Sequence, residues 1–154
     1  MAILDSGDPL IYGPCAWCLE EFEDLNPVVV PGLSSFNAAL RRGITTSENT
    51  KSVILTAADW MGKADTIDKL SVHQTTMVLF TMRTEFQEFI DKLSINYPPE
   101  TPVAVVKFAG HAGKEEVVQA TLGTILDRVG SDKLPFEYLL YVGEFLTHRD
   151  KKTE

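Results

Sequence analysis

Residues 28–36 read VVVPGLSSF, and this stretch decides the fold expected for the chain. A second glycine-centred turn, SGDPLIYG at residues 6–13, lies earlier in the sequence. Each turn follows a short apolar run, Val28–Val30 or Ile3–Leu4, and each leads into a helix-compatible stretch. Glycine permits positive φ and lets a ligand lie against bare backbone. Open α/β sheets bind ligands in loops that follow a strand and open toward a helix, so the pair predicts a small-molecule site built from two loops.

The first 46 residues are expected to form an incomplete β-α-β-α piece. Trp17, Phe22 and Leu25 give residues 14–25 an apolar helical stripe, and the glutamates between them give a solvated face. Ser34 or Ser35 can cap a second helix over residues 36–42. Such a half-unit cannot cover both faces of its own sheet. The chain therefore looks as though it begins in the middle of a domain.

Residues 47–154 are expected to form a second, C-terminal α/β domain with a mixed sheet. The polar stretch 44–51 is a candidate linker between the two parts. Apolar and β-branched runs predict strands, and helical spacing of apolar residues predicts helices between them. The strands are expected at 52–56, 75–82, 102–108, 114–122 and 136–142, and the helices at 85–93 and 122–129.

The charge of the chain argues against nucleic acid as a partner. The formal net charge is −8, and binding to phosphate backbones needs clustered Lys and Arg. No apolar run approaches the roughly 20 residues of a membrane-spanning helix. The first residues also lack the pattern of a signal peptide. We therefore expect no membrane partner and a cytoplasmic location.

Cys15 and Cys18 form a CxxC pair, which is compatible with either a thiol redox site or half of a zinc site. A zinc site needs about four ligands, and the sequence contains no second cysteine pair and only scattered histidines. We therefore expect no metal. The pair lies within a predicted helical run, so two partly buried helix cysteines are the simpler interpretation, and a redox module is the alternative.

Four separated motifs resemble the tetrapyrrole (corrin/porphyrin) methylase family, and they occur in the family's order. They are SGDP at 6–9, VVPGLSSF at 29–36, TMVLF at 76–80, and the block TPVAVV at 101–106 with Ala109–Gly110 and TLGTI at 121–125. Within this family, KLSVHQTTM at 69–77 is most similar to the precorrin-4 C11-methyltransferases. The family's opening glycine–proline loop has no counterpart in these 154 residues.

The resemblance implies an enzyme that transfers a methyl group from S-adenosylmethionine to a tetrapyrrole or corrin precursor in cobalamin biosynthesis, releasing S-adenosylhomocysteine. It also implies a homodimer. By the same resemblance, residues at the ends of strands and in the two glycine loops would contact the donor: Ser6, Gly7, Asp8, Ile11, Ser34, Ser35, Thr81, Met82, Ala109 and Gly110. Asp8 and Ser34 are equally compatible with capping roles.

Because the glycine–proline loop contributes to both the donor site and the substrate trough in this family, the chain by itself is expected to be inactive. A non-catalytic dimerisation or assembly piece of such an enzyme is the alternative.

Other residues have a functional and a structural interpretation. His111, next to Ala109–Gly110, is a better candidate for a general base than His73, but a lone histidine is commonly a surface residue. Phe108 and Trp60 could stack on a macrocycle, although such aromatic residues more often belong to the core. Glu115 and Glu116 are expected to be solvated.

Overall fold

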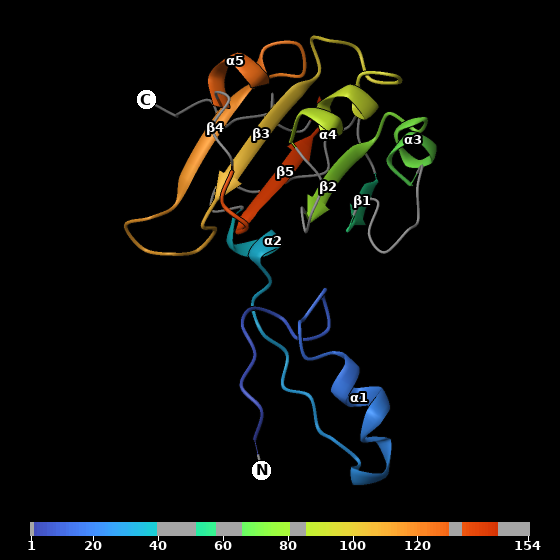
Figure 1. Cartoon of the computed structure of the whole chain (residues 1–154), viewed down its shortest axis with the longest axis vertical. Helices are drawn as coiled ribbons and strands as arrows, with labels where there is room; N and C mark the ends of the chain where they lie inside the picture. The colour runs from blue at the N-terminus through green and yellow to red at the C-terminus, as the bar shows by residue number, and fades with distance from the viewer. Residues whose placement is uncertain (1, 40–51, 58–65, 81–85, 130–133, 145–154) are drawn as a thin grey trace, which may run out of the picture.

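The computed structural model describes residues 2–39, 52–57, 66–80, 86–129 and 134–144. Within them, a five-stranded mixed sheet organises the C-terminal part of the chain (Figure 1). β1 and β2 pair in parallel, and the other neighbouring strands are antiparallel. The predicted mixed sheet is confirmed. In spatial order the strands are β1 (Val53–Thr56), β2 (Thr76–Phe80), β5 (Tyr138–Val142), β3 (Pro102–Lys107) and β4 (Glu116–Thr121).

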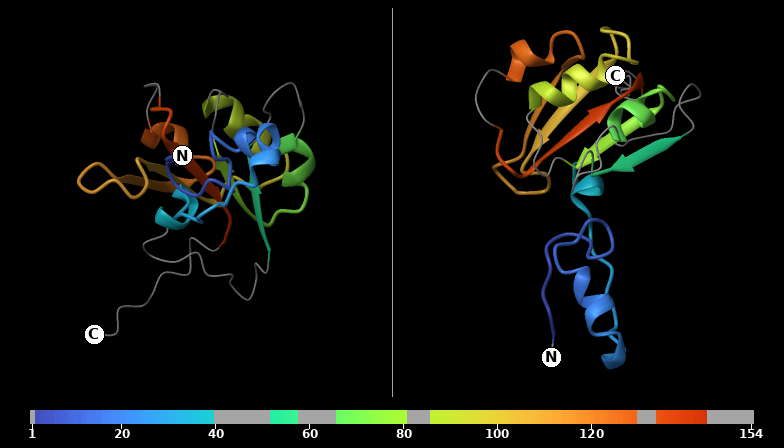
Figure 2. Two further views of the ribbon diagram at one scale, coloured as in Figure 1. Left: turned by 90° about the horizontal axis from the view of Figure 1, so that it is seen from below. Right: turned by 45° about the vertical axis from the view of Figure 1, so that its right-hand side comes forward.

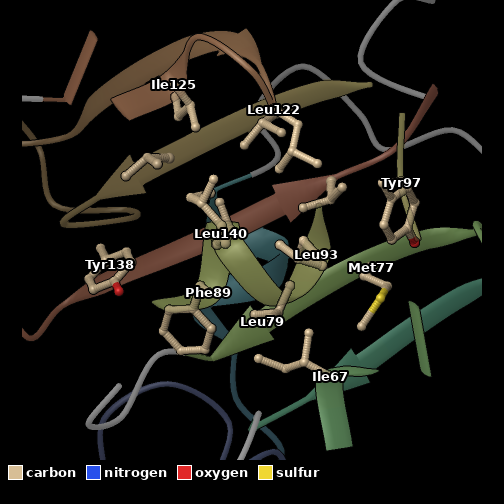
Figure 3. Close-up of a cluster of buried hydrophobic side chains, with 14 residues drawn as sticks. Ile67, Met77, Leu79, Phe89, Leu93, Tyr97, Leu122, Ile125, Tyr138 and Leu140 are labelled. Atoms are coloured by element: carbon tan, nitrogen blue, oxygen red, sulfur yellow. The ribbon is translucent and has the colours of Figure 1, made fainter. Parts of the chain in front are cut away.

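Three helices supply apolar side chains to one face of the sheet. They are α3 (Thr66–Ser71), α4 (Phe86–Leu93) and α5 (Ile125–Val129). In α4, Phe89, Ile90 and Leu93 are buried because helical spacing places them on one side. They pack with alternate residues of β2, β3 and β5 in the cluster drawn in Figure 3. The helix predicted at 85–93 is confirmed from residue 86 onward.

The opposite face of the sheet carries a smaller cluster. Its buried members are the intervening residues of the same three strands: Val78, Phe80, Ala104, Val106, Leu139 and Tyr141. Ile11, Phe36 and Ala39 from the N-terminal part pack against them. Every residue of β2 and β5 is therefore buried, which explains their nearly continuous apolar sequences.

The N-terminal part of the chain projects away from the sheet (Figures 1 and 2). We refer to residues 2–33 as the N-terminal arm. The arm contains α1 (Trp17–Glu21) and a 3-10 turn, η1 (Glu23–Leu25), in place of the continuous helix expected at 14–25. α2 (Ser35–Ala38) follows the arm and joins it to the sheet.

The prediction of strands at Ile3–Leu4 and Val28–Val30 is wrong. Neither segment forms a strand, although both are apolar, because a strand exists only where a neighbouring backbone pairs with its N–H and C=O groups. The helices of the predicted β-α-β-α piece are present in shortened form. The proposed division between residues 46 and 47, the linker 44–51 and the end of the helix predicted at 36–42 lie outside the described residues.

Candidate functional site

The two glycine loops of the arm pack directly against each other. Gly7 has a φ of +85°, in the left-handed region that glycine tolerates. A Cβ placed on Gly32 would lie 1.8 Å from the carbonyl oxygen of Gly7. No side chain fits between these backbones, so the contact requires glycine at position 32. The sequence interpretation that the two turns cooperate is consistent with this contact.

Aspartate side chains fix the shape of the first loop. Asp5 accepts hydrogen bonds from the backbone N–H of Ser6 at 2.7 Å and of Cys15 at 3.3 Å. Asp8 accepts from the N–H of Leu10 at 2.9 Å, the usual geometry of an Asx turn. The capping interpretation of Asp8 therefore has a structural partner.

Ser34 links the second loop to α2. It is 2% exposed, and its Oγ accepts a hydrogen bond from the N–H of Phe36 at 3.3 Å, as an N-cap residue does. At the other side of α2, the Tyr141 hydroxyl of β5 donates to the carbonyl oxygen of Phe36 at 3.1 Å. Burial, reinforced by the negative charge of Glu115, raises the pKa of Tyr141. The second loop is thereby held against the middle of the sheet.

A third loop, residues 108–111, follows β3. Phe108 has a φ of +52° and donates its N–H to the carbonyl of Glu137 at 2.8 Å. Gly110 has a φ of +78°, and a Cβ there would lie 2.9 Å from the Cβ of Ala38. Its N–H donates to the carboxylate of Glu115 at 2.7 Å. Glu115 is therefore engaged with the backbone, which corrects the expectation that it is solvated.

These three loops and the ends of β2, β3 and β5 enclose a cleft of about 580 Å³, a size typical of small-molecule sites. Seven of the ten residues predicted to contact the donor line it: Ser6, Gly7, Ile11, Ser34, Ser35, Ala109 and Gly110. Asp8 is not among the lining residues. Thr81 and Met82 lie outside the described residues.

The sequence profile of the tetrapyrrole (corrin/porphyrin) methylases matches residues 1–126. The chain belongs to this family. A precorrin-4 C(11)-methyltransferase from Mycobacterium tuberculosis (strain ATCC 25618 / H37Rv) is 30% identical over 157 residues, covering 96% of this chain and 62% of that protein. The chain thus spans less than two thirds of the length of this relative. The family recognised from the four sequence motifs is confirmed.

Solved structures of other tetrapyrrole methylases share the fold. A cobalt precorrin-4 methyltransferase of cobalamin biosynthesis has a TM-score of 0.77 at 24% identity, covering 92% of this chain and 63% of that chain. A uroporphyrin-III C-methyltransferase from Thermus thermophilus, complexed with S-adenyl homocysteine, has a TM-score of 0.67 at 19% identity, covering 92% and 64% respectively.

Among the described residues, five aromatic side chains line the cleft of this family member, and sequence reasoning missed most of them. Tyr12 packs on Phe80 with ring centroids 4.8 Å apart, and the cleft is also lined by Phe136, just before β5, and by Tyr138, the first residue of β5. Only the pairing of distant strands brings them together, so no local motif marks them. Phe108 also lines the cleft, and its suggested stacking role stays a prediction.

The two histidines considered as general bases occupy different places. His111 lines the cleft. His73 is exposed in the turn after α3 and does not line the cleft. Trp60, the other suggested stacking residue, lies outside the described residues.

The surroundings of Cys15 do not favour the reactive thiolate form. Cys15 and Cys18 are both free and partly buried. Partial burial, the Asp5 carboxylate and Cys18 raise the pKa of the Cys15 thiol, whereas reactive CxxC thiols have lowered pKa values. Among the described residues, no group of three or more His, Cys, Asp or Glu side chains is placed to hold a metal. None of the helices in the described part of the chain is long and apolar enough to cross a membrane.

Proposed function

We propose that the chain carries the donor-binding core of an S-adenosylmethionine-dependent C-methyltransferase. Its substrate would be a tetrapyrrole or corrin precursor of cobalamin biosynthesis, with precorrin-4 methylation at C11 as the specific reaction. The proposal is supported by family membership and by the relative named as a precorrin-4 C(11)-methyltransferase. The solved Thermus thermophilus relative contains the demethylated donor, S-adenyl homocysteine.

The observation that carries the proposal is the convergence of three loops on one cleft. Gly7, Gly32 and Gly110 let the backbones approach one another closely, and they leave bare peptide groups beside the cleft. The apolar rings of Tyr12, Phe80 and Phe108 face the same volume and offer surfaces for a flat adenine or macrocycle. These residues fit an adenosyl donor.

When bound, S-adenosylmethionine would supply a methyl group attached to a positively charged sulfur. Transfer of that methyl group to an electron-rich ring carbon would leave the sulfur as a neutral thioether. The chain's own contribution is then to hold both molecules in line and to exclude water. Loops and backbone groups can do this without a catalytic triad. Within the described residues, Ser34 and Ser35 are suited to hold polar groups of the donor, and the aromatic residues are suited to shield its reacting end.

The donor site is tested by titrating the ¹⁵N-labelled chain with S-adenosylhomocysteine and following backbone amides by NMR. The expected shifts lie at Gly7, Ser35 and Gly110. Residues of the helices that cover the opposite face of the sheet, such as Phe89 in α4, serve as internal controls. We expect weak binding and no methyl transfer by these 154 residues, because the glycine–proline loop expected from the family is absent from the sequence. Shifts confined to other regions, or none at millimolar ligand, would contradict the donor site.

Assembly through the N-terminal arm is a second candidate function, and homodimer formation is its most direct form. The specific observation is a set of large apolar side chains in the arm that are exposed, and exposed apolar surface of this kind marks interaction sites where it is contiguous. They are Ile3, Leu4, Leu10, Trp17, Phe22, Leu25, Val28, Val30 and Leu33.

Sedimentation equilibrium at micromolar concentration distinguishes this second candidate. We expect a dimer for the chain and a monomer for Val28→Asp, which puts a charge on the arm where the side chain is 88% exposed. Val72→Asp, at an exposed apolar residue after α3, is the matched control and is expected to remain dimeric. A clean monomer for the unmodified chain would contradict assembly through the arm.

A further inference from the structure

The carboxylate of Glu115 is bonded to the backbone immediately behind the cleft. Its Oε2 accepts the N–H of Gly110 at 2.7 Å, within the short range of charge-assisted hydrogen bonds. Glu115 itself does not line the cleft, whereas Ala109, Gly110 and His111 do. The carboxylate therefore acts on cleft-lining residues from outside the volume that a ligand would occupy.

The loop that Glu115 contacts contains one residue whose backbone conformation is uncommon. Phe108 has a φ of +52° although it is bulky and not glycine, whereas the φ of +78° at Gly110 is one that glycine tolerates. Such backbones persist where surrounding contacts hold them. One of those contacts is the Phe108 N–H to the Glu137 carbonyl at 2.8 Å, and the Gly110 N–H to Glu115 is another.

The 108–111 loop packs closely against α2 on the other side of the cleft. Gly110 lies so close to α2 that a Cβ on it would come within 2.9 Å of the Cβ of Ala38. α2 is in turn bonded to β5 through the Tyr141 hydroxyl and the Phe36 carbonyl. The negative charge of Glu115 contributes, after burial, to raising the pKa of Tyr141.

We propose that Glu115 is a positioning residue of the cleft: its carboxylate holds the Gly110 N–H and thereby seats the 108–111 loop against α2. This spacing sets the width of the cleft between Gly110 and the second glycine loop. The consequence for donor binding rests on the proposed function, whereas the seating of the loop does not.

The test compares Glu115→Ala and Glu115→Gln with the chain, by NMR of backbone amides and without any ligand. In Glu115→Ala the Gly110 amide is expected to exchange with solvent about ten-fold faster, because it loses its acceptor. The amide of Ala38 in α2 is expected to shift as well. Glu115→Gln keeps a side-chain oxygen that can accept the same bond, so it is expected to restore both signals in part.

Glu116→Ala is the matched control, because it removes the same charge from the neighbouring residue. Glu116 is paired with Lys107 at 3.1 Å on the strand pair, and its removal is expected to leave Gly110 and Ala38 unchanged. An unaltered Gly110 exchange rate in Glu115→Ala overturns the proposal, and so does a change confined to Gly110 without any at Ala38.

Donor binding is measured separately on the same variants. If the unmodified chain binds S-adenosylhomocysteine, the affinity of Glu115→Ala is expected to fall by about ten-fold, since ligand sites tolerate little displacement of their walls. An unchanged affinity in Glu115→Ala would overturn the positioning role. Failure of the unmodified chain to bind at all contradicts the proposed function alone, because the NMR comparison without ligand still decides the seating of the loop.

Discussion

In the sheet, large apolar side chains are buried on both faces of β2, β3 and β5, whereas most of those in the N-terminal arm lie exposed. Leu140 in β5 is 0% exposed, and Leu4 in the arm is 94% exposed. Both residues belong to apolar runs that predict strands. The difference shows that an apolar run forms a buried strand only where other segments of the fold cover its side chains and pair with its backbone.

The largest expected effect is on the free energy of unfolding, when the same substitution, leucine to alanine, is made once in the sheet and once in the arm. Leu140→Ala is expected to lower the free energy of unfolding by about 3 kcal/mol, because it leaves a cavity in the core. Leu4→Ala removes the same atoms from a solvated site and is expected to change it by less than about 0.5 kcal/mol. Urea unfolding followed by circular dichroism measures both. Comparable losses would mean that the arm's apolar residues are buried in solution.

Gly32→Ala tests the junction between the two regions. The new Cβ would lie 1.8 Å from the Gly7 carbonyl oxygen, so one backbone must move by more than about 1 Å, a displacement that can reduce the function of a site by on the order of 10²-fold. We expect S-adenosylhomocysteine binding by NMR to disappear while the urea midpoint of the sheet is retained. Val30→Ala, at an exposed residue two positions before Gly32 that does not line the cleft, is the control, and equal effects of the two would contradict a specific loop contact.

Tyr97→Phe tests a hydroxyl group of the buried cluster that packs against the sheet. The Tyr97 hydroxyl donates to the Thr75 carbonyl, and a bond of this kind contributes about 1 kcal/mol. Burial raises the pKa of Tyr97 to about 12, above the usual value near 10. Its neutral form therefore stabilises the fold fully below about pH 10, and this contribution is lost as pH rises through about 12.

Unfolding measured between neutral pH and pH 12 separates these two effects of Tyr97. Tyr97→Phe is expected to be less stable at neutral pH and to have a shallower decline in alkali. Tyr141 is present in both proteins and contributes equally to their remaining pH dependence. Identical alkaline slopes would show that Tyr97 ionises equally well in the folded and unfolded chains.

The smallest effect is expected at Asp8 in the arm. Asp8→Ala removes the acceptor of the Leu10 N–H, and loss of a turn or cap acceptor costs about 1 kcal/mol or less at exposed positions. We expect weaker S-adenosylhomocysteine binding through a loosened loop, with Asp8→Asn retaining most of the affinity because its amide oxygen accepts the same bond. A loss in Asp8→Asn as large as in Asp8→Ala would point to direct contact between the Asp8 charge and the ligand.

Local sequence was sufficient where neighbours in the chain determine the structure. The spacing of Phe86, Phe89, Ile90 and Leu93 predicted α4. The sequence left the cap of α2 open between Ser34 and Ser35, and the structure assigns it to Ser34. The strands of the sheet were predicted within a few residues. Their β-branched runs favour strands, and in the fold each run also has a neighbouring strand to pair with.

The rest depends on contacts between distant segments. Tyr12 reaches Phe80 and Phe136 reaches the cleft only because β2, β3 and β5 lie side by side. The role of Glu115 depends on the turn that brings it back to Gly110. Two apolar segments of the arm predicted strands for which the described residues provide no pairing, and local pattern contains no information on the partner.

The position of β5 in the sheet has a consequence for how the chain acquires its structure during synthesis. β5 lies between β2 and β3 but is the last of the five strands to be made. Without β5 the β1–β2 and β3–β4 pairs have no strand to join them, and β2 and β3 would each present an unpaired apolar edge of the kind that promotes association between chains. The Tyr141–Phe36 bond spans 105 residues, so the cleft can be completed only once β5 has been made, and its completion depends on contacts remote in sequence, which form slowly.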